Sequence, residues 1–261
     1  MKIGVFDSGI GGITVLKELI QRFPNEDFFY FGDNANLPYG TKSAEQIKNL
    51  AVSAAKFISG QRVDALVVAC NTASCIAISE IREVMGADTP VFSVVDAGVE
   101  SVVHNFRKLN SPKAPILILG TKATVRSHTY LKVISASLGK DVQIIEQECP
   151  LLVPMIEESW IEHRILEETT LEYLKNHLHL SAGVALLACT HYPWIKKTFE
   201  KLLPGWMVFD SAVAMGEALS KHFPAPTKKL KSSAREVHWQ FSDPESVPSF
   251  VFSEDLKRAV E

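Results

Sequence analysis

The sequence has few cysteines, no long basic run and no long apolar run. Its four cysteines among 261 residues are too few for a disulfide framework, so each cysteine is expected to pack or to react. No run of lysine or arginine is longer than the pair Lys228-Lys229, and the net charge is −3, which argues against binding a nucleic acid. No segment approaches the roughly 18 apolar residues of a membrane span, and the N-terminus lacks the pattern of a signal peptide. We therefore expect a cytoplasmic protein that has neither a nucleic acid nor a membrane as its partner.

Short apolar runs alternate with amphipathic stretches along the chain. The runs predict strands that are buried on both faces, and apolar residues three and four apart predict helices between them. The predicted strands are 3–6, 28–32, 65–69, 91–95, 115–119, 142–146, 184–188 and 207–209. The predicted helices are 11–23, 43–59, 72–85, 98–109, 125–138, 154–178, 192–203 and 212–222, with Ser43 and Asn71 as N-caps. This alternation predicts an α/β fold with mostly parallel sheets.

Two stretches of the sequence recur in similar form. The run 65–72 (ALVVACNT) resembles the run 185–191 (ALLACTH), and each holds a cysteine directly after a predicted strand. The opening run 3–9 resembles 116–121 at nearly the same offset. These echoes indicate two similar α/β halves. Any two buried parallel strands look alike, so it is the matched cysteine pair that favours a duplication.

Polar residues gather directly after the predicted strands. In an open parallel sheet a ligand lies beyond the carboxyl ends of the strands, where helix N-termini point their N–H groups at it. The polar clusters at such ends are Asp7-Ser8, Asp33-Asn34, Cys70-Asn71-Thr72, Thr121 with Thr124, and Cys189-Thr190-His191. If the two halves face each other, these clusters line one cleft.

Two of the cysteines occupy positions that favour reactivity. Cys70 and Cys189 each follow a buried strand and precede a helix, where the helix dipole and free N–H groups favour a thiolate. A lone cysteine at such a place is more often a small buried apolar residue, but a matched pair with polar neighbours indicates a two-thiol reaction. Asp7 in one half and His191 in the other are the neighbours that can hold or relay a proton.

Other candidate motifs give weaker signals. Cys75 and Cys149 are expected to pack, and the cysteine and histidine spacings match no structural zinc site. The glycine-rich stretch 9–12 has neither the dinucleotide-binding nor the Walker spacing. Glu157 and Glu158, taken alone, are typical of a solvated first turn of a helix. The residues by themselves therefore predict no metal and no nucleotide.

Seven motifs together resemble a known family. They are GVFDSGIGG at 4–12, PYG at 38–40, ACNTAS at 69–74, GTKAT at 120–124, VPMIEE at 153–158, CTHYP at 189–193 and DSA at 210–212. The chain resembles the cofactor-independent amino-acid racemases of the aspartate/glutamate racemase family, and within it the glutamate racemases. The resemblance implies two pseudo-symmetric α/β domains with the active site in the cleft between them. We expect residues 1–95 with 209–261 to form the first domain and residues 96–208 to form the second.

The resemblance also implies a set of catalytic roles. Cys70 and Cys189 correspond to the acid/base pair on opposite faces of the substrate Cα, so that one thiolate removes a proton and the opposite thiol delivers another. Asp7 assists the first cysteine, and Glu157 with His191 assists the second. No cofactor and no metal is required in this scheme.

Substrate contacts are carried over by the matching motifs. They are Asp7, Ser8, Tyr39, Gly40, Asn71, Thr72, Thr124, Thr190 and His191. Such a protein interconverts L-glutamate and D-glutamate and supplies D-glutamate for peptidoglycan synthesis. We keep a homodimer as a candidate oligomeric state.

Alternatives within and outside this reaction remain open. Aspartate racemase is one, although those enzymes tend to carry glutamate where His191 stands. A non-catalytic carboxylate binder or a gyrase-inhibiting relative is another, although binding alone needs neither thiol. The chain also departs from the family pattern, with Asn36 in place of an arginine and Asp96-Ala97 in place of Glu-Pro. These departures make the oligomeric state less transferable than the chemistry.

Overall fold

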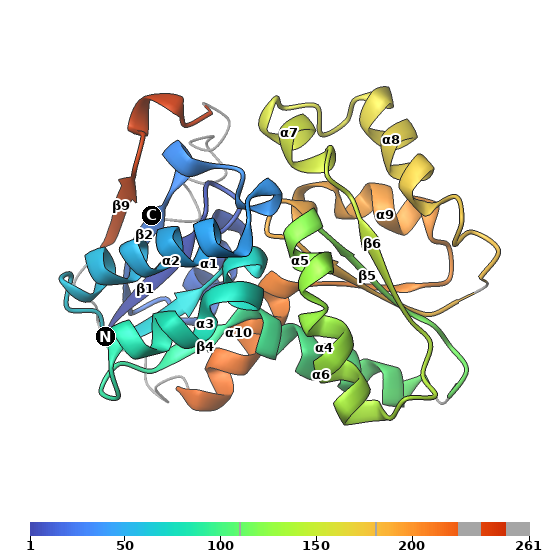
Figure 1. Cartoon of the computed structure of the whole chain (residues 1–261), viewed down its shortest axis with the longest axis horizontal. Helices are drawn as coiled ribbons and strands as arrows, with labels where there is room; N and C mark the ends of the chain where they lie inside the picture. Colours follow the sequence, from blue (N-terminus) through green and yellow to red (C-terminus); the bar gives the residue numbers. More distant parts are fainter. Residues whose placement is uncertain (110, 181, 224–235, 249–261) are drawn as a thin grey trace.

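Parallel strands form two separate sheets (Figure 1). The computed structural model describes residues 1–109, 111–180, 182–223 and 236–248. The first sheet has the order β4 (Val91–Ser93), β3 (Ala65–Val68), β1 (Lys2–Asp7), β2 (Asp27–Gly32) and β9 (Val237–Phe241). The second has the order β6 (Ile144–Glu148), β5 (Ile116–Gly120), β7 (Val184–Ala188) and β8 (Met207–Asp210). We call the elements around these sheets the β1 half and the β5 half. The predicted α/β fold with parallel sheets is confirmed.

Helices cover the sheets in both halves (Figure 1). The α-helices are α1 (Ile13–Arg22), α2 (Ala44–Ser59), α3 (Asn71–Met85), α4 (Val94–Lys108), α5 (Lys122–Ser127), α6 (Thr129–Leu138), α7 (Leu152–Glu157), α8 (Arg164–Leu174), α9 (Lys196–Leu202) and α10 (Ser211–His222). Short 3₁₀ turns are η1 (Asn34–Asn36), η2 (Tyr39–Thr41), η3 (Tyr192–Ile195) and η4 (Pro244–Ser246). In the described ranges, no helix is long and apolar enough to cross a membrane.

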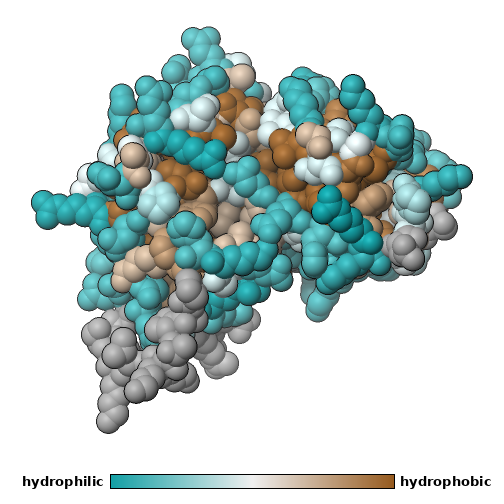
Figure 2. Space-filling view, turned by 90° about the horizontal axis from the view of Figure 1, so that it is seen from below, coloured by the Kyte–Doolittle hydropathy of each residue, from teal (hydrophilic) through white to brown (hydrophobic). Residues whose placement is uncertain are grey.

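The inner strands β3, β5 and β7 are continuous apolar runs because each sheet is packed on both faces, whereas the edge strands β6 and β9 carry polar residues. Along β1, Ile3 and Val5 enter one core cluster while Phe6 enters the cluster on the opposite face. Along β5, Leu117 enters one cluster of the second sheet and Ile118 the other. Successive side chains of a strand point to opposite faces, so a strand covered by helices on both sides needs apolar residues at every position. Seen from below, the surface also shows an apolar patch on each half with hydrophilic residues around it (Figure 2).

Two long predicted helices are each broken in the structure. The predicted helix 125–138 is two helices, because His128 adopts a left-handed conformation with φ 51° between α5 and α6. The predicted helix 154–178 is also wrong as a single element, since α7 ends at Glu157 and α8 begins at Arg164. In both cases apolar spacing continues across a break in the backbone, so periodicity alone does not reveal it.

The N-caps explain several element boundaries. Ser43 forms a capping box with Gln46, as predicted. The predicted N-cap Asn71 is wrong, because Cys70 caps α3 and its sulfur accepts a hydrogen bond from the backbone N–H of Ala73. Ser93 caps α4, which ends the predicted strand 91–95 at residue 93. A cap needs an acceptor in the right backbone conformation, and sulfur fills that role here.

One strand was not predicted from the sequence. β9 pairs in parallel with β2 and extends the first sheet. The ring centroid of Trp239 lies 5.4 Å from that of Tyr30, and the ring centroid of Phe241 lies 5.7 Å from that of Tyr30. The alternation of Val237, Trp239 and Phe241 was the available signal.

The division of the chain into two domains stays a prediction. The predicted boundary at residue 209 falls within β8, and β8 lies in the second sheet.

Candidate active site

The carboxyl ends of strands from both sheets meet at one small cavity. Cys70 follows β3 in the first sheet and Cys189 follows β7 in the second, and both cysteines line this cavity. The space is about 20 Å³, room for roughly one water molecule. The cavity thus brings the two cysteines together from separate halves of the chain, in a space too small for an amino acid.

Most of the predicted site residues surround this cavity. Those that line it are Ser8, Tyr39, Gly40, Cys70, Asn71, Thr72, Cys189, Thr190 and His191. Three predicted residues are absent from the lining, but each forms a hydrogen bond to a residue that lines the cavity. Asp7 contacts Thr190, Thr124 contacts Thr72, and Glu157 contacts His191. The prediction omitted Leu37, Pro38, Thr121 and Val153, which also line the cavity. Thr121 had a signal, since it follows a strand among the polar clusters. Pro38 and Val153 also had one, since they begin the motifs PYG and VPMIEE, whereas Leu37 had none.

Cys70 is a buried thiol held by hydrogen bonds. Its Sγ donates to the hydroxyl of Ser8 at 3.3 Å and accepts from the backbone N–H of Ala73 at 3.4 Å. Burial, together with the nearby charge of Asp7, raises the pKa of Cys70 to about 12, although the Ser8 and Ala73 hydrogen bonds oppose this. In the closed site, Cys70 is therefore protonated at neutral pH and suited to act as an acid.

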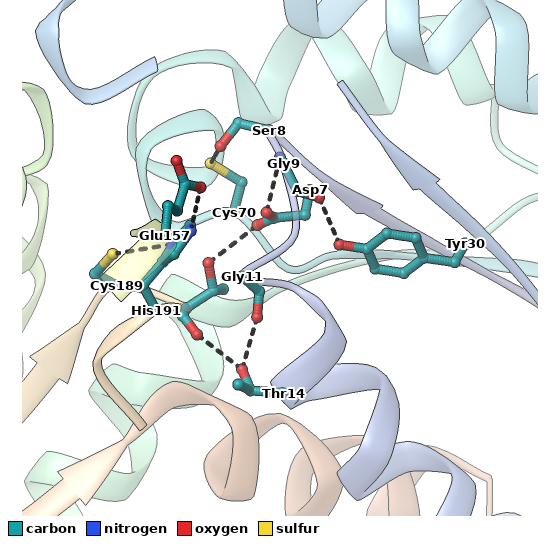
Figure 3. A network of polar contacts seen from close by, with 11 residues as sticks. Asp7, Ser8, Gly9, Gly11, Thr14, Tyr30, Cys70, Glu157, Cys189 and His191 are labelled. Atoms are coloured by element: carbon teal, nitrogen blue, oxygen red, sulfur yellow. Dashed lines mark hydrogen bonds and ion pairs between the residues drawn. The ribbon is translucent and has the colours of Figure 1, made fainter. Parts of the chain in front are cut away.

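Asp7 connects the two halves (Figure 3). Its carboxylate accepts from the backbone N–H of Gly9 at 3.0 Å and from the hydroxyl of Thr190 at 3.2 Å. Asp7 is fully buried, and this burial raises its pKa, while the positive charge of His191 pulls in the opposite direction. The carboxylate thus lies between the β1 strand end and the loop that carries the second cysteine.

His191 lies between a carboxylate and the second thiol (Figure 3). Its Nε2 contacts Glu157 Oε1 at 2.8 Å, and its Nδ1 is 4.0 Å from the Sγ of Cys189. Burial lowers the pKa of His191, but the hydrogen bonds to Cys189 and Glu157 outweigh burial and raise that pKa to about 10. The imidazole is therefore a cation at neutral pH. The two cysteines consequently have different partners, a carboxylate at Cys70 and an imidazolium at Cys189.

Tyr39, Thr72 and Thr121 line the cavity, and Thr124 lies one hydrogen bond behind Thr72. The hydroxyl of Tyr39 donates to Asp33 at 2.6 Å, which fixes its ring in the wall. Thr72 of the β1 half contacts the hydroxyls of Thr121 and Thr124 of the β5 half at 3.0 and 3.1 Å. These contacts hold the halves together around the cysteines.

The described residues contain no group of three or more His, Cys, Asp or Glu side chains arranged to hold a metal ion. Within those residues, all four cysteines are free thiols. The polar groups at the cavity are proton donors and acceptors: two thiols, a carboxylate, an imidazolium and several hydroxyls. The arrangement is suited to moving protons between two sulfur atoms and a small polar ligand.

Comparison with known proteins identifies the family. The family model described as Asp/Glu/Hydantoin racemase matches residues 3–219. The chain belongs to this family. A glutamate racemase of Sulfurihydrogenibium sp. (strain YO3AOP1) is 42% identical over 220 residues, which cover 84% of this chain and 82% of that protein. One of Neisseria gonorrhoeae is 38% identical over 219 residues, covering 84% and 78% respectively. The predicted resemblance is therefore confirmed.

Solved structures of family members have the same fold. Glutamate racemase of Campylobacter jejuni has a TM-score of 0.85 and 34% identity, covering 98% of both chains. Glutamate racemase of Francisella tularensis, solved in complex with D-glutamate, has a TM-score of 0.83 and 33% identity, covering 99% of this chain and 93% of that one. The two-sheet architecture is thus that of the glutamate racemases.

Proposed function

We propose that this protein is a glutamate racemase that interconverts L-glutamate and D-glutamate without a cofactor, and so supplies D-glutamate for peptidoglycan synthesis. The observation that carries the proposal is the meeting of two cysteines, one from each sheet, at a single cavity. Relatives named glutamate racemase over most of the chain support the choice of substrate. The substrate is a small molecule, as in the neighbour solved with D-glutamate.

In this mechanism the two thiols carry one negative charge between them. One thiolate removes the Cα proton, and the opposite thiol delivers a proton to the other face, so the stereocentre inverts. The charge released at Cα spreads into the α-carboxylate of the substrate. Backbone N–H groups at Asn71, the first residue of α3, and at Thr190 are the donors we assign to that carboxylate. The closed cavity excludes water, which strengthens these interactions.

The substrate also changes the protonation of Cys70. The charge of Asp7 is one of the causes that raise the pKa of this thiol. An α-ammonium group bound beside Asp7 would offset that charge and make removal of the thiol proton easier. Cys70 would then act as the acid for one enantiomer and as the base for the other.

Entry of the substrate requires the halves to separate. The cavity holds roughly one water molecule, and glutamate is many times larger. Contacts that join the halves would break, among them Thr14 Oγ1 to the carbonyl oxygen of Thr190 at 2.9 Å. We propose that the halves open about the two chain crossings near residues 96 and 209 and close again on the substrate.

Substituting Gly11 tests the need for this close approach. A Cβ at Gly11 would lie 2.3 Å from Thr190 Oγ1 and 2.4 Å from His191 Nδ1. Overpacking of this kind costs about 1–3 kcal/mol, so we expect Gly11→Ala to lower kcat/KM by roughly 5- to 150-fold. Gly60→Ala is the matched control, because its Cβ would meet only the carbonyl oxygen of Phe57 at 3.4 Å. Unchanged steady-state kinetics in Gly11→Ala would contradict closure at this contact.

Deuterium exchange at Cα tests the function itself. In D₂O, the protein should incorporate deuterium at Cα of glutamate from either enantiomer and bring both to the same mixture, which NMR and chiral chromatography measure. A protein that only binds carboxylates would give no exchange, and that result would end the proposal. The same assay with L-aspartate separates the two substrates. Faster exchange of aspartate than of glutamate would identify an aspartate racemase instead.

A further inference from the structure

The side-chain amide of Asn71 is held from two sides by hydroxyl groups. The hydroxyl of Tyr130 donates to Asn71 Oδ1 at 2.6 Å, and Asn71 Nδ2 donates to Ser211 Oγ at 3.1 Å. Tyr130 and Ser211 are completely buried, and Asn71 is 2% exposed. The three residues come from α6, α3 and α10, so this contact joins three elements that are distant in the sequence.

This arrangement fixes the orientation of Asn71. Rotation of the side chain would break two buried hydrogen bonds, and each unpaired group would then lack water to replace its partner. The tip of the Tyr130 ring is itself confined, since a Cβ at Gly98 of α4 would lie 3.3 Å from the Tyr130 hydroxyl. Burial raises the pKa of Tyr130 well above its ordinary value, so the hydroxyl stays a proton donor throughout the working pH range.

Asn71 links these contacts to the reaction. It is the first residue of α3, it follows Cys70 directly, and it lines the cavity. The backbone N–H groups of this first turn have no partner within the helix, and their direction follows the conformation of Asn71. Tyr130 does not line the cavity. Its hydrogen bond to Asn71 is therefore the contact by which Tyr130 reaches the cavity wall.

We propose that Tyr130 and Ser211 are positioning residues that hold Asn71, and with it the N-terminus of α3, in the orientation that binds the substrate α-carboxylate. The inference rests on the proposed racemase function and assigns two residues outside the cavity to it. Because Tyr130 belongs to the β5 half and Asn71 to the β1 half, the 2.6 Å hydrogen bond also ties this orientation to closure of the two halves.

Substituting Tyr130 by phenylalanine removes only the donor. The ring still fills its site, but Asn71 Oδ1 becomes a buried acceptor without a partner, and the amide is free to turn. Negative charge on the substrate carboxylate increases in the transition state, so misplaced donors cost more there than in the ground state. We expect kcat to fall by roughly 10- to 100-fold while KM changes much less.

Controls separate positioning from a general loss of stability. Tyr173→Phe is the matched control, because the Tyr173 hydroxyl accepts from the backbone N–H of Leu151 at 3.2 Å and does not contact the site. It should leave kcat and KM unchanged. Ser211→Ala should lower kcat in the same way as Tyr130→Phe, and the double variant should lose less than the product of the two single losses, since both act through one amide. Melting temperatures show that each variant is folded at the assay temperature.

The outcomes are distinguishable. Absence of Cα exchange in the wild-type protein would remove the proposed function and this inference with it. Wild-type exchange with unchanged kcat in folded Tyr130→Phe would overturn the inference alone. If Tyr130→Phe does not fold, Ser211→Ala decides: a kcat loss with KM retained supports positioning, and wild-type kinetics contradict it. Fully multiplicative losses in the double variant would show that the two hydroxyls do not act through Asn71.

Discussion

Replacing either Cys70 or Cys189 by serine is expected to lower racemase turnover by about 10²- to 10⁴-fold, the range of a lost general acid or base. A serine hydroxyl has nearly the volume of the thiol but releases its proton far less readily. Each cysteine is the base for one enantiomer and the acid for the other, so each substitution should slow both directions. At equilibrium the two enantiomers are equal, which also requires both directions to lose the same factor in kcat/KM.

The other two cysteines provide the control for this experiment. Cys149 is buried and Cys75 is partly buried, and burial raises the pKa of both thiols, that of Cys75 to about 12. Cys75 lies outside the cavity lining, and Cys75→Ser should keep the wild-type rate in both directions. The assay measures racemisation from L-glutamate and from D-glutamate separately. If Cys70→Ser or Cys189→Ser retained normal turnover, that cysteine would not be one of the two acid/base groups.

Local sequence patterns were sufficient to predict most strands of the fold. The strand 184–188 was predicted with its observed bounds, because a strand buried on both faces is a continuous apolar run with clear ends. Helix boundaries were less predictable. Nothing in the apolar spacing around His128 signals a left-handed residue, and that break separates α5 from α6. The strand β9 was missed although Val237, Trp239 and Phe241 alternate, and its pairing with β2, about 200 residues earlier in the chain, has no local signal.

The site residues were predictable where they follow strands and unpredictable where they depend on the packing of the two halves. Cys70 and Cys189 follow β3 and β7, so parallel topology places each cysteine at the carboxyl edge of its own sheet, and the facing of the two halves brings them together. The hydrogen bond between Asp7 and Thr190 joins residues 183 positions apart, and the one between Tyr130 and Asn71 joins residues 59 apart. No local pattern encodes such pairs. The secondary contacts that orient the cysteines and Asn71 therefore required the structure.

The surroundings of the two cysteines are asymmetric although the reaction is symmetric. Cys70 has the Asp7 charge beside it, and Cys189 has the His191 cation 4.0 Å away. In a substrate-free site these neighbouring charges and burial set the protonation of both groups. At neutral pH Cys70 keeps its proton, and His191 is a cation. Both directions of racemisation nevertheless use an enzyme with one thiolate and one thiol, because each turnover removes one proton from Cα and delivers one. The electrostatic difference thus sets where the protons rest, while the equilibrium constant of one keeps the two kcat/KM values equal.

Substituting Glu157 by glutamine is expected to move the alkaline limit of activity to lower pH. Glu157 is among the groups that raise the pKa of His191 to about 10, so the imidazolium is present below this pH and is lost above it. Burial lowers the pKa of His191, and a neutral amide in place of the Glu157 carboxylate opposes this effect less. The alkaline limb of kcat/KM should therefore shift downward by on the order of one pH unit.

Glu158→Gln is the matched control for this shift, because Glu158 is the next residue in the chain and its side chain is exposed. Profiles of kcat/KM against pH, measured for both enantiomers, should coincide for the wild-type protein and Glu158→Gln. Titration of the amino group of the substrate contributes equally to all variants, so only the difference between them reports on His191. The two enantiomers should give the same limb within each variant, since their kcat/KM values stay equal at every pH. An alkaline limb of Glu157→Gln that stayed in place, or moved to higher pH, would show that Glu157 does not hold the proton of His191 during the reaction.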